Sequence, residues 1–256
     1  MTDPTLVAVA HGTRDPAGVA TVEALLDLVR SLRPGLRVEV GYLDLVRPSL
    51  DETLAALRGE AVLVPLLLGA GYHVHTDIPT ALATAPHLRA SVAHALGPDP
   101  LLATALSARL AEAGWAGGPV VLAAAGSTNP AANADTARMA TMLQAHLNAP
   151  VLPSYLCAGS PTPAQAIAHL RTKGHTSVAI AGYLLAPGSF SRRASHSGAT
   201  LTSAPLGTHA AVANLILRRY GDTLEQATLS LGSPTPPQSP HLLCRAPLKG
   251  VSFGMH

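Results

Sequence analysis

Two stretches of this chain share one pattern, and together they decide the fold. The first is Leu6-Val-Ala-Val-Ala10 followed by His11-Gly-Thr-Arg-Asp-Pro16, and the second is Val120-Val-Leu-Ala-Ala124 followed by Ala125-Gly-Ser-Thr-Asn-Pro130. In each stretch a continuous apolar run, typical of a strand buried on both faces, leads into a polar turn and a proline. The 256 residues therefore divide into two similar halves, each of ordinary domain size.

Strand-like and helix-like segments alternate along both halves. After the first strand, for example, Val22, Leu25, Leu26 and Val29 are apolar at helical spacing. We predict strands at residues 6–10, 38–43, 61–68, 91–95, 120–124, 151–156 and 177–185, and helices at residues 19–32, 49–58, 101–113, 133–146, 163–172 and 210–220, with a further helix starting at residue 77. Such alternation predicts an α/β fold with parallel sheets and right-handed crossovers.

Gly117-Gly118-Pro119 marks the boundary between the halves. We expect a first lobe at residues 1–116, a second lobe at residues 117–225 and a tail at residues 226–256. The tail contains Ser233-Pro-Thr-Pro-Pro-Gln-Ser-Pro240, a composition that predicts an extended, mobile segment.

The composition excludes several classes of function. Charged residues make up 12% of the chain and the net charge is +2, so we expect no nucleic-acid partner. The longest apolar run, residues 61–68, is far below the ~20 residues that span a bilayer, so we expect no membrane partner. Two distant cysteines, Cys157 and Cys244, fit a reducing compartment, and no basic leader precedes the first strand. We therefore expect a cytoplasmic protein.

Three polar positions at predicted strand ends change between the halves. His11 becomes Ala125, Asp44 becomes Cys157 and His73 becomes Phe190. The carboxyl ends of parallel strands meet at one edge of a sheet, so we expect the first-half residues to lie together. Two imidazoles and a carboxylate suit iron, cobalt, nickel or zinc, and three protein ligands leave coordination positions open. The sequence thus predicts a metal site in the first lobe only.

Each of these residues also has a simpler interpretation. His11 alone is typical of a hydrogen-bonded residue at a sheet edge, and Asp44 of a turn cap before Pro48. The joint loss of all three favours the metal site, because neighbouring glycines persist. Gly12 recurs as Gly126, for which we predict a backbone role such as a positive φ or a close approach.

Together these motifs resemble a known family. The segments His11-Gly-Thr-Arg14, Tyr42-Leu-Asp44 and Leu66-Leu-Leu-Gly-Ala-Gly-Tyr-His-Val-His-Thr-Asp-Ile-Pro79 are similar to those of the class II chelatases, the sirohydrochlorin cobaltochelatase and ferrochelatase family. The resemblance covers most of residues 5–225. It implies two lobes, each with a four-stranded parallel sheet flanked by helices.

The resemblance also implies a reaction and a site. The substrates would be sirohydrochlorin and a divalent metal (Fe²⁺, Co²⁺ or Ni²⁺), with loss of two pyrrole protons and no prosthetic group. His11 and His73 match the catalytic, metal-binding pair, and Asp44 falls where the family commonly has a glutamate. The substrate-binding residues implied are Gly12, Thr13, Arg14, Tyr72 and His75. With both walls of the cleft in one chain, we expect a monomer.

Two other functions are weighed against this one. A histidine phosphatase also has His-Gly after its first strand, but it normally has an arginine just before the histidine, where this chain has Ala10. A metal carrier or tetrapyrrole-binding protein would use the same residues without catalysis. The sequence leaves this second alternative open.

Overall fold

The computed structural model describes residues 3–69, 71 and 73–232, and for His73 and residues 230–232 the backbone alone. The first half contains β1 (Thr5–Ala10), α1 (Pro16–Leu32), β2 (Val38–Tyr42), α2 (Leu50–Ala56), β3 (Gly59–Pro65), the π-helical turn η1 (His73–Asp77), α3 (Ile78–Ala83), β4 (Leu88–Val92) and α4 (Pro100–Glu112). The second half contains β5 (Val120–Gly126), α5 (Pro130–Leu147), β6 (Val151–Ala158), α6 (Pro163–Thr172), β7 (Ala179–Tyr183), α7 (Ser189–Ser195), β8 (Leu201–Thr202) and α8 (Ala210–Gly232).

The strands form two parallel sheets of the same topology. Their orders are β2-β1-β3-β4 and β6-β5-β7-β8, so β1 and β5 hold equivalent inner positions. Every residue of β1 is buried, as its continuous apolar run predicts. The predicted α/β fold of two similar four-stranded lobes is confirmed.

Local signals repeat between the halves as well. Ser49 caps α2 and Thr162 caps α6, each with a capping box completed by Glu52 or Gln165. The helix start predicted at residue 49 is therefore confirmed. These caps fix where two helices begin after the turns that follow β2 and β6.

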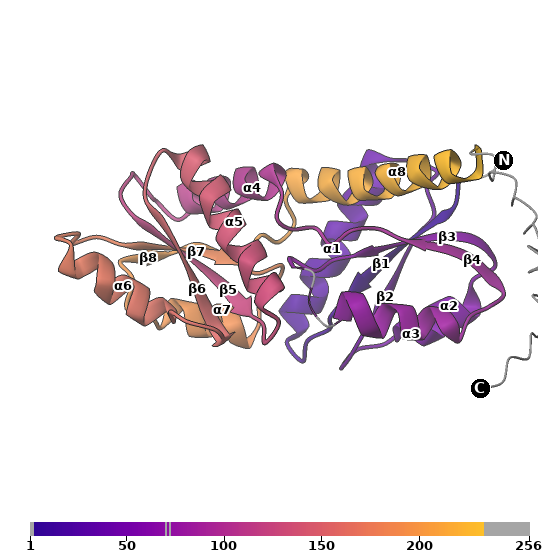
Figure 1. The fold of residues 1–256 in the computed structure, drawn as a ribbon, viewed down its shortest axis with the longest axis horizontal. Helices are drawn as coiled ribbons and strands as arrows, with labels where there is room; N and C mark the ends of the chain where they lie inside the picture. The colour runs from indigo at the N-terminus through magenta and orange to yellow at the C-terminus, as the bar shows by residue number, and fades with distance from the viewer. Residues whose placement is uncertain (1–2, 70, 72, 233–256) are drawn as a thin grey trace, which may run out of the picture.

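The halves exchange one helix each. Helix α4 packs against α5 and β7 of the second half, whereas α8 packs against α1 and β3 of the first. Figure 1 shows α8, in yellow, lying along the lobe of β1–β4, and α4 beside α5. One continuous cluster of buried side chains consequently serves both sheets, with members such as Leu26 of α1, Leu106 of α4, Met139 of α5 and Ile216 of α8.

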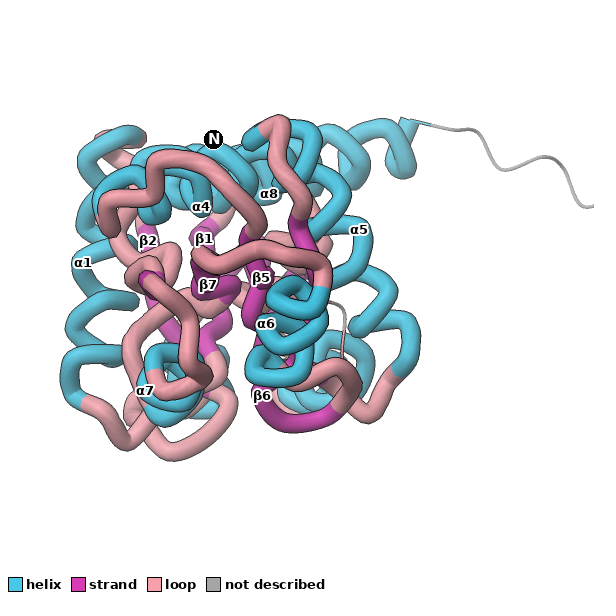
Figure 2. Tube along the Cα trace, turned by 90° about the vertical axis from the view of Figure 1, so that its left-hand side faces the viewer, coloured by secondary structure: helices cyan, strands magenta, loops and turns pink. Residues whose placement is uncertain are grey.

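The opposite faces of the sheets have separate cores. Val9, Leu54 and Ile78 belong to the cluster under α2 and α3, and Ala123 and Ile167 to the cluster between β5 and α6. In Figure 2, α4 and α8 lie above the strands, and α7 lies below β1, β2 and β7. The predicted division at residue 117 follows the sheets, but the helix packing crosses it, so the division into two domains stays a prediction.

The observed elements differ from the sequence-based predictions in several places. The fourth strand is Leu88–Val92 and not residues 91–95, although the following Ala93 still donates its N–H to Leu63 O at 2.8 Å. No element was predicted at Ser189–Ser195, which forms α7. The last helix continues past Tyr220 to Gly232, so the first seven residues of the predicted tail, 226–232, are helical.

The rest of that tail, residues 233–256, lies outside the described residues. In the part of the chain that the structure does describe, none of the helices has the length and apolar character to cross a bilayer.

Candidate functional site

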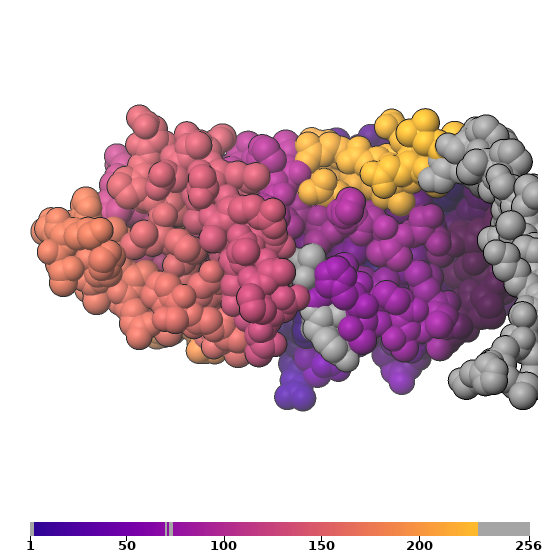
Figure 3. All heavy atoms as spheres, viewed as in Figure 1, coloured from indigo at the N-terminus to yellow at the C-terminus, as the bar shows by residue number. Residues whose placement is uncertain are grey.

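A cavity of about 1190 Å³ lies between the two lobes, at the carboxyl ends of their central strands. The described lining residues come from four parts of the chain, within residues 10–22, 66–69, 124–136 and 183–192, with Tyr42, Leu45, Gly71 and Cys157. Figure 3 shows the surfaces of the two halves meeting directly, with α8 over one edge of the first. Parallel sheets gather ligands at this edge, so the cavity is the candidate site.

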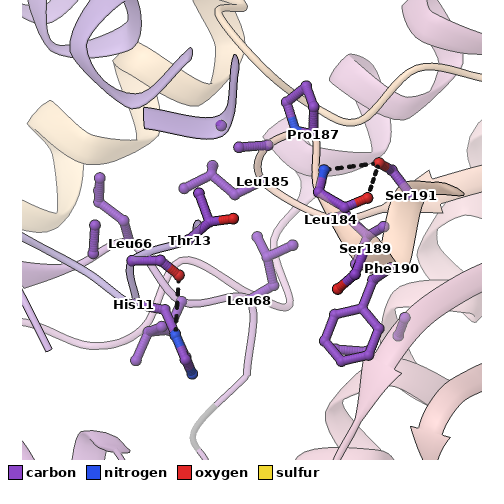
Figure 4. Close-up of a pocket in the computed structure, with 18 of the residues that line it drawn as sticks. His11, Thr13, Leu66, Leu68, Leu184, Leu185, Pro187, Ser189, Phe190 and Ser191 are labelled. Atoms are coloured by element: carbon purple, nitrogen blue, oxygen red, sulfur yellow. Dashed lines mark hydrogen bonds between the residues drawn. The ribbon is translucent and has the colours of Figure 1, made fainter. Parts of the chain in front are cut away.

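His11 lies on the wall of this cavity, immediately after β1. Its side chain is exposed, and Nδ1 is 3.3 Å from the carbonyl oxygen of Gly12. In Figure 4, His11 and Phe190 lie on opposite sides, with Leu68 between them. An accessible imidazole at this position suits both metal binding and proton transfer.

Asp44 lies beside His11 through its backbone. The Asp44 N–H donates to the His11 carbonyl at 3.0 Å, and the Asp44 carboxylate accepts from the N–H of Leu45 at 2.8 Å. The Asp44 side chain is exposed, and it is Leu45 that lines the cavity. The two predicted ligands therefore share one sheet edge, but the Asp44 carboxylate is held by its own turn.

The third predicted ligand, His73, begins η1, and its side chain lies outside the described residues, as does the whole of Tyr72. His75 is exposed in η1 and is not among the described cavity-lining residues. Among the described side chains, which do not include that of His73, no group of three or more histidine, cysteine, aspartate or glutamate residues is placed to hold a metal. The three-ligand site stays a prediction.

Gly12 lies where the backbone at Asp44 comes too close to leave room for a side chain. Its φ is +97°, and a Cβ there would lie 1.9 Å from the carbonyl oxygen of Asp44. Gly126 repeats the arrangement, with a φ of +87° and 2.2 Å from a Cβ to Ala158 O. The backbone role predicted for this pair is confirmed, and it explains why the glycine persists where His11 does not.

The loop that follows Gly12 contacts the second half of the chain. Thr13 accepts a hydrogen bond from the N–H of Asp15 at 3.1 Å, and Arg14 is exposed on the cavity wall. Arg192 of α7 forms an ion pair with Asp15. These contacts lower the pKa of the Asp15 carboxyl. The hydrogen bond from Arg192 is the largest cause, and the bond from Ala17 N–H is the second.

The second half forms the facing wall. Ala125, Cys157 and Phe190, which replace the three predicted ligands, all line the cavity. Next to them, the Ser127 N–H donates to Asn133 Oδ1 at 3.0 Å, and Asn133 Nδ2 donates back to Ser127 O at 2.7 Å. We did not predict a site role for Asn133, although the repeat of the β1–α1 turn as the β5–α5 turn is a signal for it.

A duplicated α/β unit with a shared cavity at its sheet edges is the architecture of the class II chelatases. SirB from Bacillus subtilis with Fe³⁺ has a TM-score of 0.74 to this structure, at 23% identity over 88% of this chain and 97% of that one. The cobalt complex of the sirohydrochlorin chelatase SirB from Bacillus subtilis subspecies spizizenii has a TM-score of 0.71, at 22% identity and the same coverage. At these identities the likeness establishes the fold.

The chain belongs to the CbiX family, whose model matches residues 5–113 and again residues 119–223. The resemblance noted from the motifs is thereby confirmed, and so is the duplication. The sirohydrochlorin cobaltochelatase of Methanopyrus kandleri is 35% identical over 85 residues, which are 32% of this chain and 59% of that protein. That of Methanosarcina acetivorans is 28% identical over 82 residues, 30% of this chain and 63% of that protein. The chain thus spans about three fifths of these curated relatives.

Proposed function

We propose that this protein inserts a divalent metal ion into sirohydrochlorin, with loss of two pyrrole protons. Membership of the CbiX family supports the reaction class, and the names of the curated relatives support the substrate. The observation that carries the proposal is the place of His11, exposed on the wall of a large cavity at the end of β1.

In this proposal His11 and His73 bind the incoming metal and accept the pyrrole protons. A neutral imidazole does both near pH 7, because its unperturbed pKa is about 6.5. The metal and the base must approach the same face of the macrocycle, which favours two histidines on one lobe. Asp44 assists from the same sheet edge, with its carboxylate oriented by Leu45 N–H.

The cavity suits a macrocycle that carries acidic side chains. Its volume exceeds the roughly 300–1,000 Å³ of common small-molecule pockets. Leu68 and Leu185 offer apolar surface to the ring, while Arg14 and Arg192 stand on the wall for carboxylates. We assign substrate contacts to Gly12, Thr13 and Arg14, and by the family resemblance to Tyr72 and His75.

The metal is a substrate and not a resident cofactor. The Bacillus relatives were obtained with Fe³⁺ and with cobalt. An imidazole and carboxylate site accepts Fe²⁺, Co²⁺ and Ni²⁺, so we propose that metal supply decides which one is inserted.

An anaerobic spectrophotometric assay tests the function. Sirohydrochlorin is mixed with Co²⁺ or Fe²⁺ and protein, and insertion is followed by its change in absorption. We expect the wild type to exceed the spontaneous rate, His11→Ala and His73→Ala to lose at least about 100-fold, as removal of a general base does, and His146→Ala on α5 to match the wild type. Binding without acceleration would indicate a carrier, and hydrolysis of an aryl phosphate abolished by His11→Ala would indicate a phosphatase.

We also propose that one chain is sufficient for the reaction. The second half supplies the wall that faces His11, so no second copy is needed to close the cavity. Sedimentation of the active protein as a monomer is the expected result, and activity confined to a dimer would contradict it.

A further inference from the structure

A tyrosine of the second half holds the wall of the first half. Tyr183 ends β7 and is 2% exposed, and its hydroxyl donates to the carbonyl oxygen of Leu68 at 2.9 Å. The two residues are 115 positions apart and both line the cavity. The bond therefore runs from one lobe to the other beside the candidate site.

The bond acts on the segment that leads from β3 to η1. Leu66 N–H donates to Val9 O at 2.8 Å, Leu67 O accepts from Leu96 N–H at 2.8 Å, and Leu68 O accepts from Tyr183. The chain is thus held at three successive residues as it leaves the sheet. The backbone of His73 begins η1 five positions after Leu68, so Leu68 is the one of these three held residues that lies nearest to η1 in the chain.

Gly97 provides space for this hydroxyl. A Cβ on Gly97 would lie 2.0 Å from Tyr183 Oη and 2.4 Å from Leu68 O. Three segments, β7, the β3–η1 connection and the β4–α4 connection, consequently meet at a point where only a glycine fits. This packing is an observation independent of the hydrogen bond, and it points to the same contact.

The equivalent carbonyl in the second half is held differently. There Leu185 O accepts from the backbone N–H of Gly207 at 2.8 Å. Pro65 pairs with Val9 and Gly182 pairs with Ala123, and Val9 and Ala123 hold equivalent positions in the two halves. Leu66, which follows Pro65, is therefore the counterpart of Tyr183, which follows Gly182. Leucine has no hydroxyl to return the bond. The interlobe hydrogen bond therefore has no equivalent from the first half to the second. It runs from the second half to the first, which contains the predicted metal ligands.

We propose that Tyr183 is a positioning residue for metal insertion: its interlobe hydrogen bond fixes Leu68 on the cavity wall, at the start of the connection from β3 to η1. The proposal rests on the proposed chelatase function. Tyr183 does not touch the metal, and it acts through the Leu68 backbone. It also gives the second half a role beyond closing the cavity.

The test compares Tyr183→Phe with Tyr220→Phe. Tyr220 is also buried, and its hydroxyl donates to Pro4 O at 2.6 Å, remote from the cavity lining, so each variant loses one buried hydroxyl bond to a carbonyl. We expect equal losses of Tm. We expect kcat/KM for Co²⁺ to fall about 10-fold in Tyr183→Phe only, because small misplacements of reacting groups are costly, with KM for sirohydrochlorin unchanged.

Calorimetric binding of Co²⁺ to the tetrapyrrole-free protein is the second readout. We expect affinity to weaken about 10-fold in Tyr183→Phe and to stay unchanged in Tyr220→Phe, since displaced ligands bind more weakly. If the two variants behave alike in both readouts, the positioning role is wrong and the chelatase proposal survives. A wild type that inserts no metal, with cobalt binding still weakened only in Tyr183→Phe, would overturn the reaction and keep the positioning role.

Discussion

Arg192 of α7 and Asp15 at the start of α1 are 177 residues apart, yet Nη1 of the arginine lies 2.6 Å from Oδ2 of the aspartate. Asp15 also caps α1 by accepting from Ala17 N–H at 3.1 Å. One carboxylate thus joins a helix terminus of the first half to a helix of the second. Both residues of the pair line the cavity, so the tie closes one part of its wall.

This ion pair gives a pH dependence of known sign. The pKa of Asp15 in the folded protein is lowered from 3.8, so the ionised carboxylate stabilises the fold above that value. This stabilisation is lost as pH falls through the lowered pKa. Arg192→Gln should raise the pKa of Asp15, though not fully to 3.8, because Ala17 still donates. NMR titration of the carboxyl carbon measures it, with Arg193→Gln as control, since Arg193 lies over the Phe190 ring. Equal titrations in both variants would contradict the assignment.

Gly12 should be among the least replaceable residues of the site. In Gly12→Ala an alanine must adopt a positive φ, which costs about 1–3 kcal/mol. Its Cβ would also clash with Asp44 O at 1.9 Å, and only a movement of the backbone can relieve that clash. Gly35→Ala is the control, because Gly35 has a φ of +89° with nothing near its Cβ position. Urea unfolding should give a clearly larger loss for Gly12→Ala. Comparable losses would mean that the close approach carries no energy.

Most strands and helix starts were predictable, because they depend on local signals. Continuous apolar runs identified β1 and β5, and Ser49 with Glu52 fixed the start of α2. Helix α7 was missed, because Ser189–Ser195 has little apolar periodicity and buries only Ala194. The exchange of α4 and α8 could not be predicted either, since an apolar face does not specify which of two similar sheets it covers.

The site was predictable in part for the same reason. Position after a strand pointed to His11, which the structure places on the cavity wall, while its chemical role stays a prediction. Tyr183 and Arg192 were not linked in advance to Leu68 and Asp15, because these contacts join residues more than 100 positions apart and depend on how the lobes pack.

Asp99 should be a main stabilising contact of the exchanged helices. Its side chain is 6% exposed, and its carboxylate caps α4 through Leu101 N–H and pairs with Arg218 and with Arg219, the latter at 3.2 Å. Asp99→Asn keeps the cap but leaves Arg219 without its counter-charge, so we expect a loss of about 3 kcal/mol in urea unfolding.

Asp27→Asn is the matched control for this loss. Asp27 pairs with Arg30 at 2.7 Å on the surface, with 73% of its side chain exposed, and such pairs contribute less than about 1 kcal/mol. A loss at Asp99 no larger than at Asp27 would show that the buried ion pair does not stabilise the packing of α8.

A chain that ends at Gly117 should not persist as a folded monomer. It would lack α8, whose Leu215, Ile216 and Tyr220 are fully buried, and its own α4 would have no second sheet to cover. In a dimer, each α4 can cover the sheet of the other copy in the way α8 does now. We expect dimers or aggregates by light scattering, and a compact monomer that binds no hydrophobic dye would refute this.

The helix exchange also determines how ligands enter and leave. Both sheets pack on one shared core. A hinge motion that opened the two lobes would therefore separate the packed leucines of α1, α4, α5 and α8. We therefore expect the two sheets to stay fixed relative to each other, so that a ligand of the cavity enters and leaves through the loops at its mouth. Heat should accordingly melt the whole protein in one calorimetric step, with neither half surviving the other.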